Sequence, residues 1–360
     1  MHPSSEFARL FSSVHQPVIG TDGERVVFAN PTAKTAAGFD PTGRNAAEII
    51  PQEILESAAD NFVCAASIFN RKASISVVRD RGVTILFLEF ICVRKSSFNL
   101  TRNMIGNLRS CVMGLKMSAD RCFSMLEEGK TPEEKYSSVF YHYYYSLLRS
   151  LVHIDSADLL ERGEILFSPV PTDLVKLCTE LTDTISLLCS KTGVGVSFVS
   201  EEKSLIAVVD PLRIEQLLLN LFSNSLQYTS AGNNIVLSLS RSGNRIILSL
   251  DDDGEGISQE TLSNIFSLPD DARDQDPSRT GSGLGLYISF GIAQLHNGVL
   301  LIESRVDAGT RVRVMLPADE DPSPKFSSPE TSYNSSCPQP VLTELSCVLP
   351  SSCFGPKFED

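Results

Sequence analysis

The sequence has no apolar run that approaches the roughly 20 residues needed to cross a bilayer. Its most apolar stretch, residues 83–93, is shorter and already contains Glu89. The first residues also lack the basic-then-apolar pattern of a secretory signal. These absences predict a cytoplasmic protein that does not enter a membrane.

The sequence also has fewer basic than acidic residues. Lys and Arg number 31 against 44 Asp and Glu, which gives a formal net charge of −13. Binding nucleic acid without regard to sequence needs many Lys and Arg side chains that displace phosphate counterions. The charge therefore excludes that function, and it favours a soluble protein that anionic membranes repel.

The nine cysteines include no CxxC pair, and clusters with metal-ligand spacing are absent. An odd number of scattered cysteines is typical of reduced thiols that fill the core. The sequence therefore predicts neither a disulfide framework nor a zinc site.

A chain of 360 residues with 42% apolar content is long enough for two or three domains, each with its own core. The patterning divides it into residues 1–95, 96–161, 162–317 and 318–360. We therefore expect a multidomain α+β protein, and the four parts are treated in turn.

Residues 1–95 predict a small mixed α/β domain. Asp22-Gly23 supplies a turn between an apolar run at 17–20 and a β-branched strand at 25–30. Short helices are expected at 31–37 and 46–57, and strands at 73–80 and 83–93. The segment LFSSVHQPVIGTDGERVVFANPTA resembles the opening of a PAS sensor domain. The alternative is an α/β domain that only packs against the rest of the chain.

Residues 96–161 predict a hairpin of two antiparallel helices, at 97–127 and 134–161. Gly129 ends the first, and Thr131 and Pro132 are typical of the start of the second. Because a hairpin of this length buries only one stripe per helix, we expect it to form a homodimer as a four-helix bundle.

Residues 162–317 alternate between helical and strand patterns. Helices are expected at 172–191, 210–229 and 286–297, and strands at 195–199, 204–208, 235–240, 244–251, 299–305 and 310–316.

Residues 318–360 change composition abruptly. Seven acidic and two basic residues stand among many Ser and Pro, which predicts a disordered tail. The apolar island at 341–350 leaves open a short docking segment.

The predicted helix at 210–229 places three polar residues on one face. Asp210 is a suitable N-cap, and Asn220, Asn224 and Tyr228 follow at intervals of four. Amide oxygens on one face can hold a Mg²⁺ ion that also takes phosphate oxygens. The alternative is a pair of asparagines on a solvated face.

A carboxylate and two glycines follow the strand at 244–251. Asp252 is suited to accept a hydrogen bond from an exocyclic amino group of adenine, and Gly254 and Gly256 allow the backbone to approach the base before Ile257. The alternatives are an acidic turn and a calcium loop, although the ladder of oxygen ligands that calcium needs is not evident.

A second glycine cluster, Gly281, Gly283 and Gly285, leads into the helix that begins near Leu286. Backbone N–H groups at such a helix start bind phosphates. The Lys-Ser/Thr of a P-loop is missing, and no strand precedes the cluster as in a dinucleotide fold. The polar stretch 269–280, which carries Arg279, predicts a mobile loop over the site.

These motifs together resemble the ATP-binding domain of sensor histidine kinases, which is shared with gyrase, the heat-shock chaperone ATPase and mismatch-repair ATPases (the GHKL superfamily). RIEQLLLNLFSNSLQYT is similar to the N box, DDGEGI and GSGLGL to the two glycine boxes, Ile265-Phe266 to the F box and Ala308-Gly309-Thr310 to the final element. The resemblance implies an α/β sandwich with ATP between a helical layer and a sheet.

The resemblance also implies roles for single residues. Asn224 would be the Mg²⁺ ligand, with Asn220 facing phosphate or metal. Tyr228 would lie against adenine, and Asp252 would bind its amino group. The remaining nucleotide-binding positions would be Gly254, Gly256, Ile257, Arg279, Gly281, Gly283, Leu284, Gly285, Leu286 and Thr310. Gln227 departs from the Lys that is common in the family.

The helical hairpin is similar to the family's dimerisation and phosphotransfer domain, but it lacks the phosphoacceptor. Gly106 stands where the family has His, Asn107 where it has an acidic residue and Cys111 where it has Pro. Glycine offers no nucleophile for phosphoryl transfer. Two other histidines lie on the hairpin, His142 and His153, either as substitute acceptors or as ordinary surface or seam residues.

The sequence as a whole predicts a homologue of sensor histidine kinases that binds ATP and Mg²⁺ without phosphorylating itself at the usual position. Its partner would be a response regulator or a partner kinase. One rival is an active kinase that uses His142, His153 or a partner protein as acceptor. Another is an ATPase clamp of the gyrase or chaperone kind, which the order of the segments does not favour.

Overall fold

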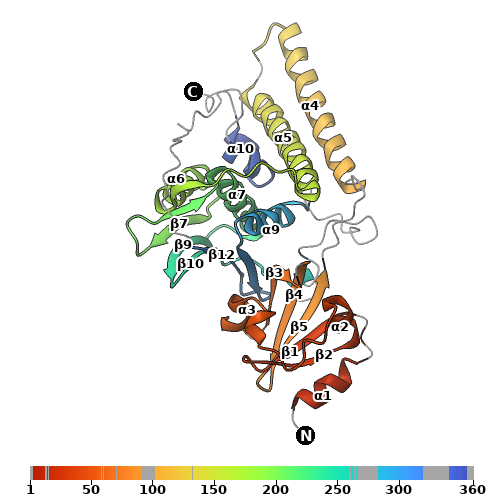
Figure 1. Ribbon diagram of the computed structural model, residues 1–360. Coiled ribbons are helices and arrows are strands. Elements are labelled where there is room, and N and C mark those ends of the chain that lie inside the picture. Colours follow the sequence, from red (N-terminus) through yellow and green to blue (C-terminus); the bar gives the residue numbers. More distant parts are fainter. Residues whose placement is uncertain are drawn as a thin grey trace.

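The computed structural model describes residues 3–12, 14, 16–57, 59, 61–69, 71–90, 102–131, 133–258, 261–262, 265, 283–318 and 340–354. Figure 1 shows three parts along the chain: an N-terminal α/β unit, a pair of long helices, and a unit in which helices cover a sheet.

The N-terminal unit is a five-stranded antiparallel sheet in the order β2-β1-β5-β4-β3, flanked by short helices. Asn30 caps the second helix, since its side chain accepts a hydrogen bond from the N–H of Ala33. The expected strands and short helices are present, but no sequence pattern indicated α1 or β3. The elements are α1 (Pro3–Leu10), β1 (Val18–Thr21), β2 (Val26–Ala29), α2 (Pro31–Ala37), η1 (Ala46–Glu48), α3 (Gln52–Glu56), β3 (Asn61–Ile68), β4 (Arg71–Asp80) and β5 (Val83–Phe90).

Two long helices follow, α4 (Arg102–Glu127) and α5 (Glu134–Arg162), within a few residues of the predicted bounds. They pack along each other, and a short connection makes them antiparallel (Figure 1). The ring of Tyr143 crosses α4 at Gly114, where a built Cβ would lie only 2.4 Å from the ring. A larger residue at position 114 would push the two helices apart.

The third unit packs three helices on one face of a five-stranded sheet, β11-β12-β10-β9-β7. All neighbouring strands are antiparallel except β7 and β9, which are parallel. A separate two-stranded sheet, β6-β8, was not expected as a pair. The elements are β6 (Val170–Asp173), α6 (Leu174–Cys189), β7 (Gly195–Ser200), β8 (Ile206–Val209), α7 (Pro211–Tyr228), β9 (Asn234–Ser242), β10 (Arg245–Asp252), α9 (Gly285–Leu295), β11 (Val299–Ser304) and β12 (Thr310–Pro317).

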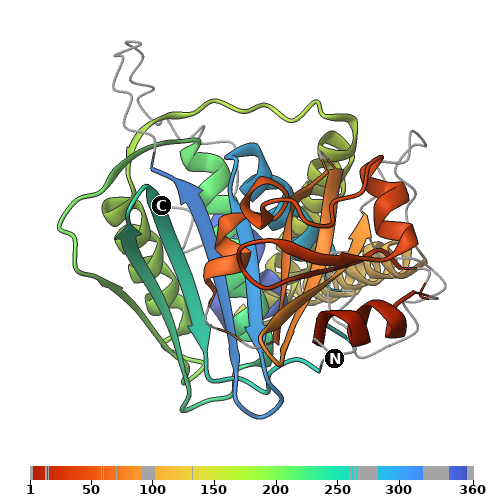
Figure 2. The same ribbon diagram turned by 60° about the horizontal axis from the view of Figure 1, so that its bottom comes forward.

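The first and third units share one ten-stranded sheet, because β3 pairs with β11. Leu300, Leu301 and Ile302 lie opposite Ala65, Cys64 and Val63 in antiparallel register. Figure 2 shows the strands of both units side by side. Single-sequence patterns carry no information about which edge strands meet, so this junction could not be predicted.

Side chains on both faces of the sheet join the two units. On one face Leu301, Val299 and Met315 share a core with residues of the N-terminal unit. Arg245 at the start of β10 forms an ion pair with Glu53 of α3. The junction is therefore packed as a protein interior and not only bonded through its backbone.

Part of the predicted disordered tail is helical and buried, which corrects that expectation for residues 340–354. This segment forms α10 (Pro340–Glu344), η2 (Leu345–Cys347) and η3 (Ser351–Cys353), and it packs on α5 and α7. The docking alternative at 341–350 describes it better, because Leu342, Leu345 and Leu349 are all buried in the main core. The rest of the tail lies outside the described residues.

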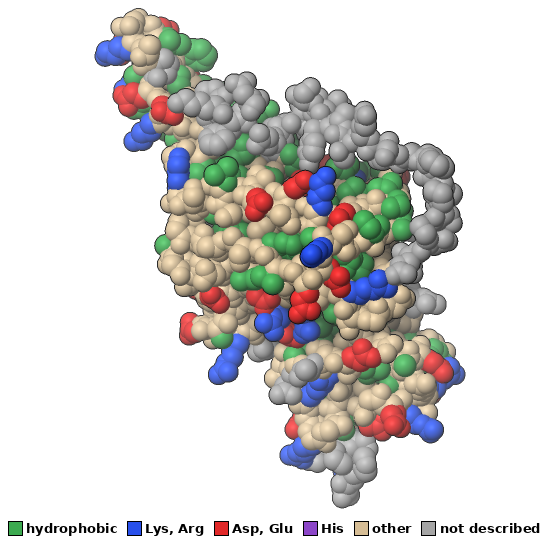
Figure 3. All heavy atoms as spheres, turned by 90° about the vertical axis from the view of Figure 1, so that its left-hand side faces the viewer, with side chains coloured by type: hydrophobic (Ala, Val, Ile, Leu, Met, Phe, Trp, Pro, Cys, Tyr) green, Lys and Arg blue, Asp and Glu red, His purple; other side chains and the backbone are tan. Residues whose placement is uncertain are grey.

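Among the described residues, no helix combines the length and the apolar character that crossing a bilayer requires. On the face seen in Figure 3, acidic and basic side chains of the described residues are interspersed with hydrophobic ones.

Shortening a side chain at the sheet junction should loosen it. Leu301 is 1% exposed, so Leu301→Ala should lower the free energy of unfolding by about 2–5 kcal/mol, through lost burial and the cavity left behind. It should also speed alkylation of the buried thiol of Cys64, which lies opposite Leu301. Urea unfolding and iodoacetamide labelling followed by peptide mass analysis would measure the two effects.

The matched control is Leu187→Ala on α6, because Leu187 is 72% exposed. Its effect on the free energy of unfolding should stay within about 0.5 kcal/mol. Equal, small effects of both substitutions would contradict the packed junction.

Candidate nucleotide-binding site

Helix α7 begins where the sequence predicted. The Asp210 side chain accepts a hydrogen bond from the N–H of Arg213 at 3.2 Å, and Pro211 occupies the first turn. The backbone N–H of Asp210 in turn donates to His296 Nε2 at 3.0 Å. This buried histidine thus has a structural partner and fixes the start of α7 against the end of α9.

The two asparagines of α7 face inward and not toward solvent. Asn220 is 0% exposed, yet neither its amide nitrogen nor its amide oxygen has a hydrogen-bond partner among the described residues. The amide nitrogen of Asn224, one turn later, is also buried without a hydrogen-bond partner among the described residues. Buried polar atoms without partners are costly. The arrangement therefore favours residues kept for a polar ligand over the solvated-face alternative.

Asp252 ends β10, and its carboxylate joins three parts of the unit. Oδ2 accepts a hydrogen bond from Ser225 Oγ of α7 at 2.8 Å. Oδ1 accepts from the N–H groups of Gly254 at 3.1 Å and Thr310 at 3.2 Å. Helix α7, the first glycine loop and strand β12 are thus held around one side chain, as expected for a carboxylate that must be precisely oriented.

The first glycine loop follows Asp252 at very close range to α7. A Cβ built on Gly254 would lie 2.6 Å from the carbonyl oxygen of Tyr228, so only glycine fits there. Farther along, the N–H of Glu255 donates to that same oxygen at 3.2 Å. The N–H of Ile257 donates to Ser304 Oγ at 2.8 Å. The loop is therefore built for close backbone approach, and its geometry favours this interpretation over a simple acidic turn.

Burial raises the pKa of the Asp252 carboxyl above its usual value, and the nearby Asp253 acts in the same direction. The hydrogen bonds from Ser225, Gly254 and Thr310 act in the opposite direction and stabilise the ionised form. The carboxylate is therefore a partly desolvated acceptor, which strengthens any bond it accepts from a ligand.

The second glycine cluster reaches α7 at Asn220. Helix α9 begins at Gly285, after Gly283 in the left-handed region and Leu284, which provides no side-chain cap. A Cβ built on Gly285 would lie 3.6 Å from Asn220 Oδ1. The start of α9, which includes Leu286, thus lies beside the unpartnered amide, in the position predicted for phosphates.

Tyr228, the last residue of α7, has a 48% exposed side chain at the rim of this region. Gly256, with a positive φ, continues the loop beside the turn after β11. Arg279, Gly281, Phe266 and the loop at 269–280 lie outside the described residues, so their predicted roles stay predictions.

Sequence reasoning missed two serines of the site. Ser225 donates to Asp252 from α7, and Ser304 at the end of β11 donates to the carbonyl oxygen of Gly309 at 3.0 Å while it holds Ile257. The helical period could have indicated Ser225, because it follows the buried Leu221 and Leu218 of α7 by four and seven residues. No local pattern distinguishes Ser304.

The site fits Mg²⁺ through oxygen atoms of neutral side chains. The described residues contain no group of three or more His, Cys, Asp or Glu that could hold a metal ion. The unpartnered amide oxygen of Asn220 suits a cation that keeps several waters and shares phosphate oxygens. Asn224 and Asn220 are the residues that would hold it.

On the helical hairpin, Gly106 lies on the exposed side of α4, and a Cβ added there would meet nothing within 4 Å. His153 is 1% exposed, and its Nε2 lies 2.8 Å from Glu344 Oε2. His142 is half-buried against Tyr143 and Phe354, and burial lowers the pKa of its imidazole. Neither histidine is presented to solvent as a free acceptor.

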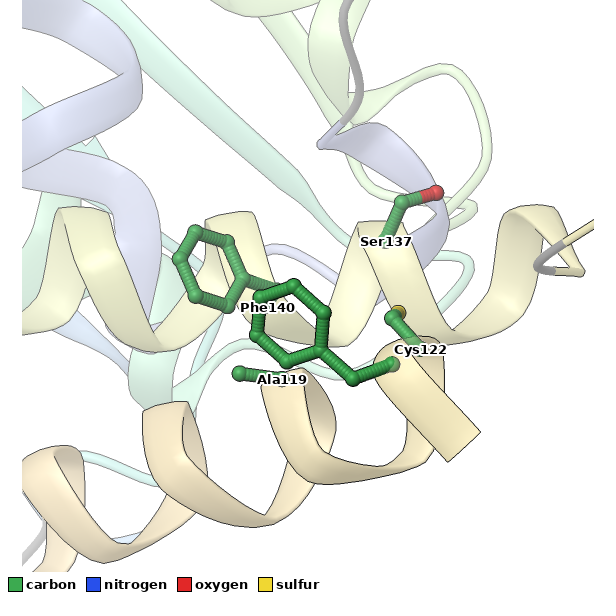
Figure 4. Close-up of a pocket in the computed structure, with 5 residues that line it drawn as sticks. Ala119, Cys122, Ser137 and Phe140 are labelled. Atoms are coloured by element: carbon green, nitrogen blue, oxygen red, sulfur yellow. The ribbon is translucent and has the colours of Figure 1, made fainter. Parts of the chain in front are cut away.

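An apolar hollow of about 200 Å³ lies between α4 and α5, near their connection. Figure 4 shows Ala119 and Cys122 of α4 facing Phe140 and Ser137 of α5 across it. It shares no residue with the nucleotide constellation and belongs to the hairpin surface.

Comparison with known protein families matches residues 209–320 to the family described as histidine kinase-, DNA gyrase B- and HSP90-like ATPase. The matched range contains α7, both glycine clusters and β12. It includes every described residue of the site.

Similar proteins are histidine kinases. Histidine protein kinase DivJ of Caulobacter vibrioides is 36% identical over 108 residues, which cover 30% of this chain and 18% of that protein. Sensor histidine kinase YvrG of Bacillus subtilis is 31% identical over 124 residues, which cover 34% of this chain and 21% of that protein. The chain thus matches about a fifth of the length of these relatives.

Among solved structures, the histidine kinase AdeS of Acinetobacter baumannii has a TM-score of 0.46 and 16% identity. That similarity covers 61% of this chain and 100% of the AdeS chain.

Removing the Ser225 hydroxyl should raise the Asp252 pKa further, because one donor to the ionised form is lost. When folding raises the pKa of an acid, the free energy of unfolding of the protein falls as pH rises from the unfolded-state pKa through the folded-state pKa. Ser225→Ala should therefore lower the free energy of unfolding by about 2 kcal/mol at pH 7. The difference should shrink as pH falls through about 4, and it should be smallest near about pH 3, where the carboxyl is mostly protonated in both folded and unfolded states.

Urea unfolding at several pH values would measure this difference. Ser137→Ala on α5 is the control, since its hydroxyl bonds only a local carbonyl at an exposed position. A Ser225→Ala effect that does not change with pH would show that the hydroxyl does not act through Asp252.

Proposed function

We propose that the chain binds Mg-ATP as a degenerate member of the sensor histidine kinase family, which its ATPase domain resembles, and that it does not phosphorylate itself at the usual position. The whole protein would act in two-component signalling by changing conformation with its ligands and not by histidine phosphorylation.

The observation that carries the nucleotide proposal is the combination of Asp252 and Asn220 in one buried region. Asp252 is a held, partly desolvated acceptor suited to an adenine amino group. Asn220 presents unpartnered amide atoms beside the start of α9. An acceptor for a base, near the C-terminal end of α7, and a place for phosphates, near its middle, thus lie along one helix.

Mg²⁺ bound at Asn224 would neutralise phosphate charge. Asn220 and the backbone N–H groups at the start of α9 would bind and orient the phosphates. Tyr228, at the rim, would cover the base, with Gly254, Gly256 and Ile257 providing the backbone against it. Arg279 and Gly281 complete the proposed set on the basis of the sequence motif alone.

Gly106 supports the degenerate character. It occupies an exposed site on α4, where a side chain would meet open space, but it carries none. Asn107 cannot act as a general base. The rival, in which His142 or His153 accepts the phosphoryl group, gains no support from their burial.

The two-helix unit is proposed to be a degenerate phosphotransfer hairpin that forms a homodimer. Its inner stripe is buried between α4 and α5, and a second apolar set on α4 remains exposed. Burying such a stripe against another copy is what a four-helix bundle achieves. The exposed residues are Ile105, Val112, Met113, Met117, Phe123 and Leu126.

The N-terminal unit is proposed to be a PAS-like input domain, on the basis of its five-stranded antiparallel sheet with short helices after β2. A response regulator or a partner kinase is the proposed downstream partner, because the similar proteins are histidine kinases.

Replacing Asp252 should remove nucleotide binding without unfolding the domain. Asp252→Asn changes the acceptor pattern that faces the adenine amino group, so the Kd for Mg-ATP should rise at least about tenfold, the equivalent of one lost hydrogen bond. Isothermal titration of purified protein with Mg-ATP would measure it.

Asp253→Asn is the matched control, since the Asp253 side chain is exposed beside the site and the charge change is the same. Its Kd should stay within about twofold of the wild-type value. If both variants bind like the wild type, the pocket has been assigned wrongly.

Incubation with γ-labelled ATP and Mg²⁺ tests the degenerate character directly. We expect no label on the wild-type protein, and acid-labile label on the double variant Gly106→His, Asn107→Glu, because position 106 is exposed and has room for a side chain and the introduced glutamate restores a general base. Gly106→Ala is the control: it should raise helix stability by about 1 kcal/mol without providing a nucleophile.

Acid-labile label on the wild-type protein would contradict the proposal and direct attention to His142 and His153. An unlabelled Gly106→His, Asn107→Glu protein that still binds ATP would contradict the placement of residue 106 as the acceptor position.

A further inference from the structure

The 340–354 segment fills the angle between the helical hairpin and the ATPase domain. Figure 1 shows α10 beside α5 and α7, and both helices contact it. Six of its apolar side chains belong to the same core as those two helices and are at most 8% exposed. They are Val341, Leu342, Leu345, Leu349, Cys353 and Phe354. Burial of this many apolar side chains is typical of a segment that is part of the folded core and not of a loosely attached tail.

A buried charge fixes the segment in one position. Glu344 Oε1 accepts a hydrogen bond from Arg149 Nε at 2.8 Å, and Glu344 Oε2 lies 2.8 Å from His153 Nε2. Both partners stand on α5, one turn apart. All three side chains are nearly inaccessible to solvent.

The same cluster reaches the ATPase domain through Ser223 of α7. Its hydroxyl accepts from Arg149 Nη2 at 3.2 Å, lies 3.4 Å from Cys347 Sγ, and donates to the Glu344 carbonyl oxygen at 3.4 Å. Ser223 directly precedes Asn224, the proposed Mg²⁺ ligand. Hairpin, ATPase domain and segment thus meet in one hydrogen-bonded group.

Burying a carboxylate is favourable only when its partners are all in place. Burial alone would raise the Glu344 pKa, but Arg149 and His153 hold it at about 2. An apolar segment shifted by one residue would leave a buried, unpaired charge. The leucines alone would allow the segment to pack on α5 and α7 in several positions. The charge cluster therefore selects one of these positions.

The last residues of the segment extend the contact along α5 and α6. The Phe354 ring lies 5.4 Å from that of His142 and 5.6 Å from that of Tyr145, between centroids. Lys191 Nζ donates to the carbonyl oxygen of Ser352 at 3.4 Å. Both hairpin histidines are thus in contact with this one segment.

We propose that the 340–354 segment is an intramolecular clamp that holds α5 of the hairpin on α7 of the ATPase domain and keeps His153 out of solvent. Opening the clamp exposes His153, together with the α5 and α7 surfaces beneath it, and allows the ATPase domain to move relative to the hairpin. The clamp is independent of whether the site binds ATP.

Glu344→Gln tests the clamp in the full-length protein. The substitution keeps the shape but leaves Arg149 without its counter-charge. We expect hydrogen exchange of α10 amides to become about a hundredfold faster, and diethylpyrocarbonate to modify His153 faster by a similar factor. Unchanged exchange and modification would overturn the proposal.

Ser352→Ala is the matched control in the same segment. Its side chain is exposed, and the bond from Lys191 goes to its backbone carbonyl, which the substitution retains. Its exchange and modification rates should equal those of the wild-type protein; an effect as large as that of Glu344→Gln would mean that the segment responds to any change and that the charge cluster does not fix it.

The wild-type protein offers a test that needs no variant and therefore no assumption about folding. If one opening event exposes both groups, the protection factor of the α10 amides and that of His153 should agree within about threefold, each relative to an unfolded peptide. Modification of His153 while α10 remains protected would overturn the clamp. Because neither readout involves nucleotide, failure of the clamp is distinguishable from failure of the ATP site.

Discussion

The carboxylate of Asp252 is the contact on which the arrangement of the site depends. It accepts bonds from α7, from the first glycine loop and from the start of β12, so these three elements can only meet in one geometry. Ser304 makes a similar connection between the loop and the turn after β11. The partial desolvation that raises the Asp252 pKa is the energetic cost of presenting this acceptor to a ligand.

Much of the ATPase domain could be predicted because its signals are local. Asp210 and Pro211 mark the start of α7, glycines mark the loops, and apolar periodicity separates helices from strands. The approach of Gly285 to Asn220 was expected only from the family resemblance, because no local pattern indicates that contact. The predictions for Arg279 and Gly281 remain predictions, since these residues lie outside the described part of the chain.

What the sequence could not provide is the pairing of distant segments. The β3–β11 junction depends on edge strands whose partner no local pattern encodes. Composition predicted a disordered tail. This prediction was wrong at residues 340–354, because the leucines and the glutamate of this segment pack on a complementary surface of α5 and α7. In the sequence, Glu344 cannot be distinguished from an exposed acidic residue, because its partners Arg149 and His153 are distant in the chain.

The most direct test of the central claim is the change in amide hydrogen exchange of the wild-type protein on addition of Mg-ATP, resolved by peptide. The account predicts slower exchange at residues 252–257, at the start of α9 and around Thr310, with little change in β4 and β5 of the N-terminal unit. No change around Asp252, or protection confined to another part of the chain, would contradict a nucleotide site built on this carboxylate.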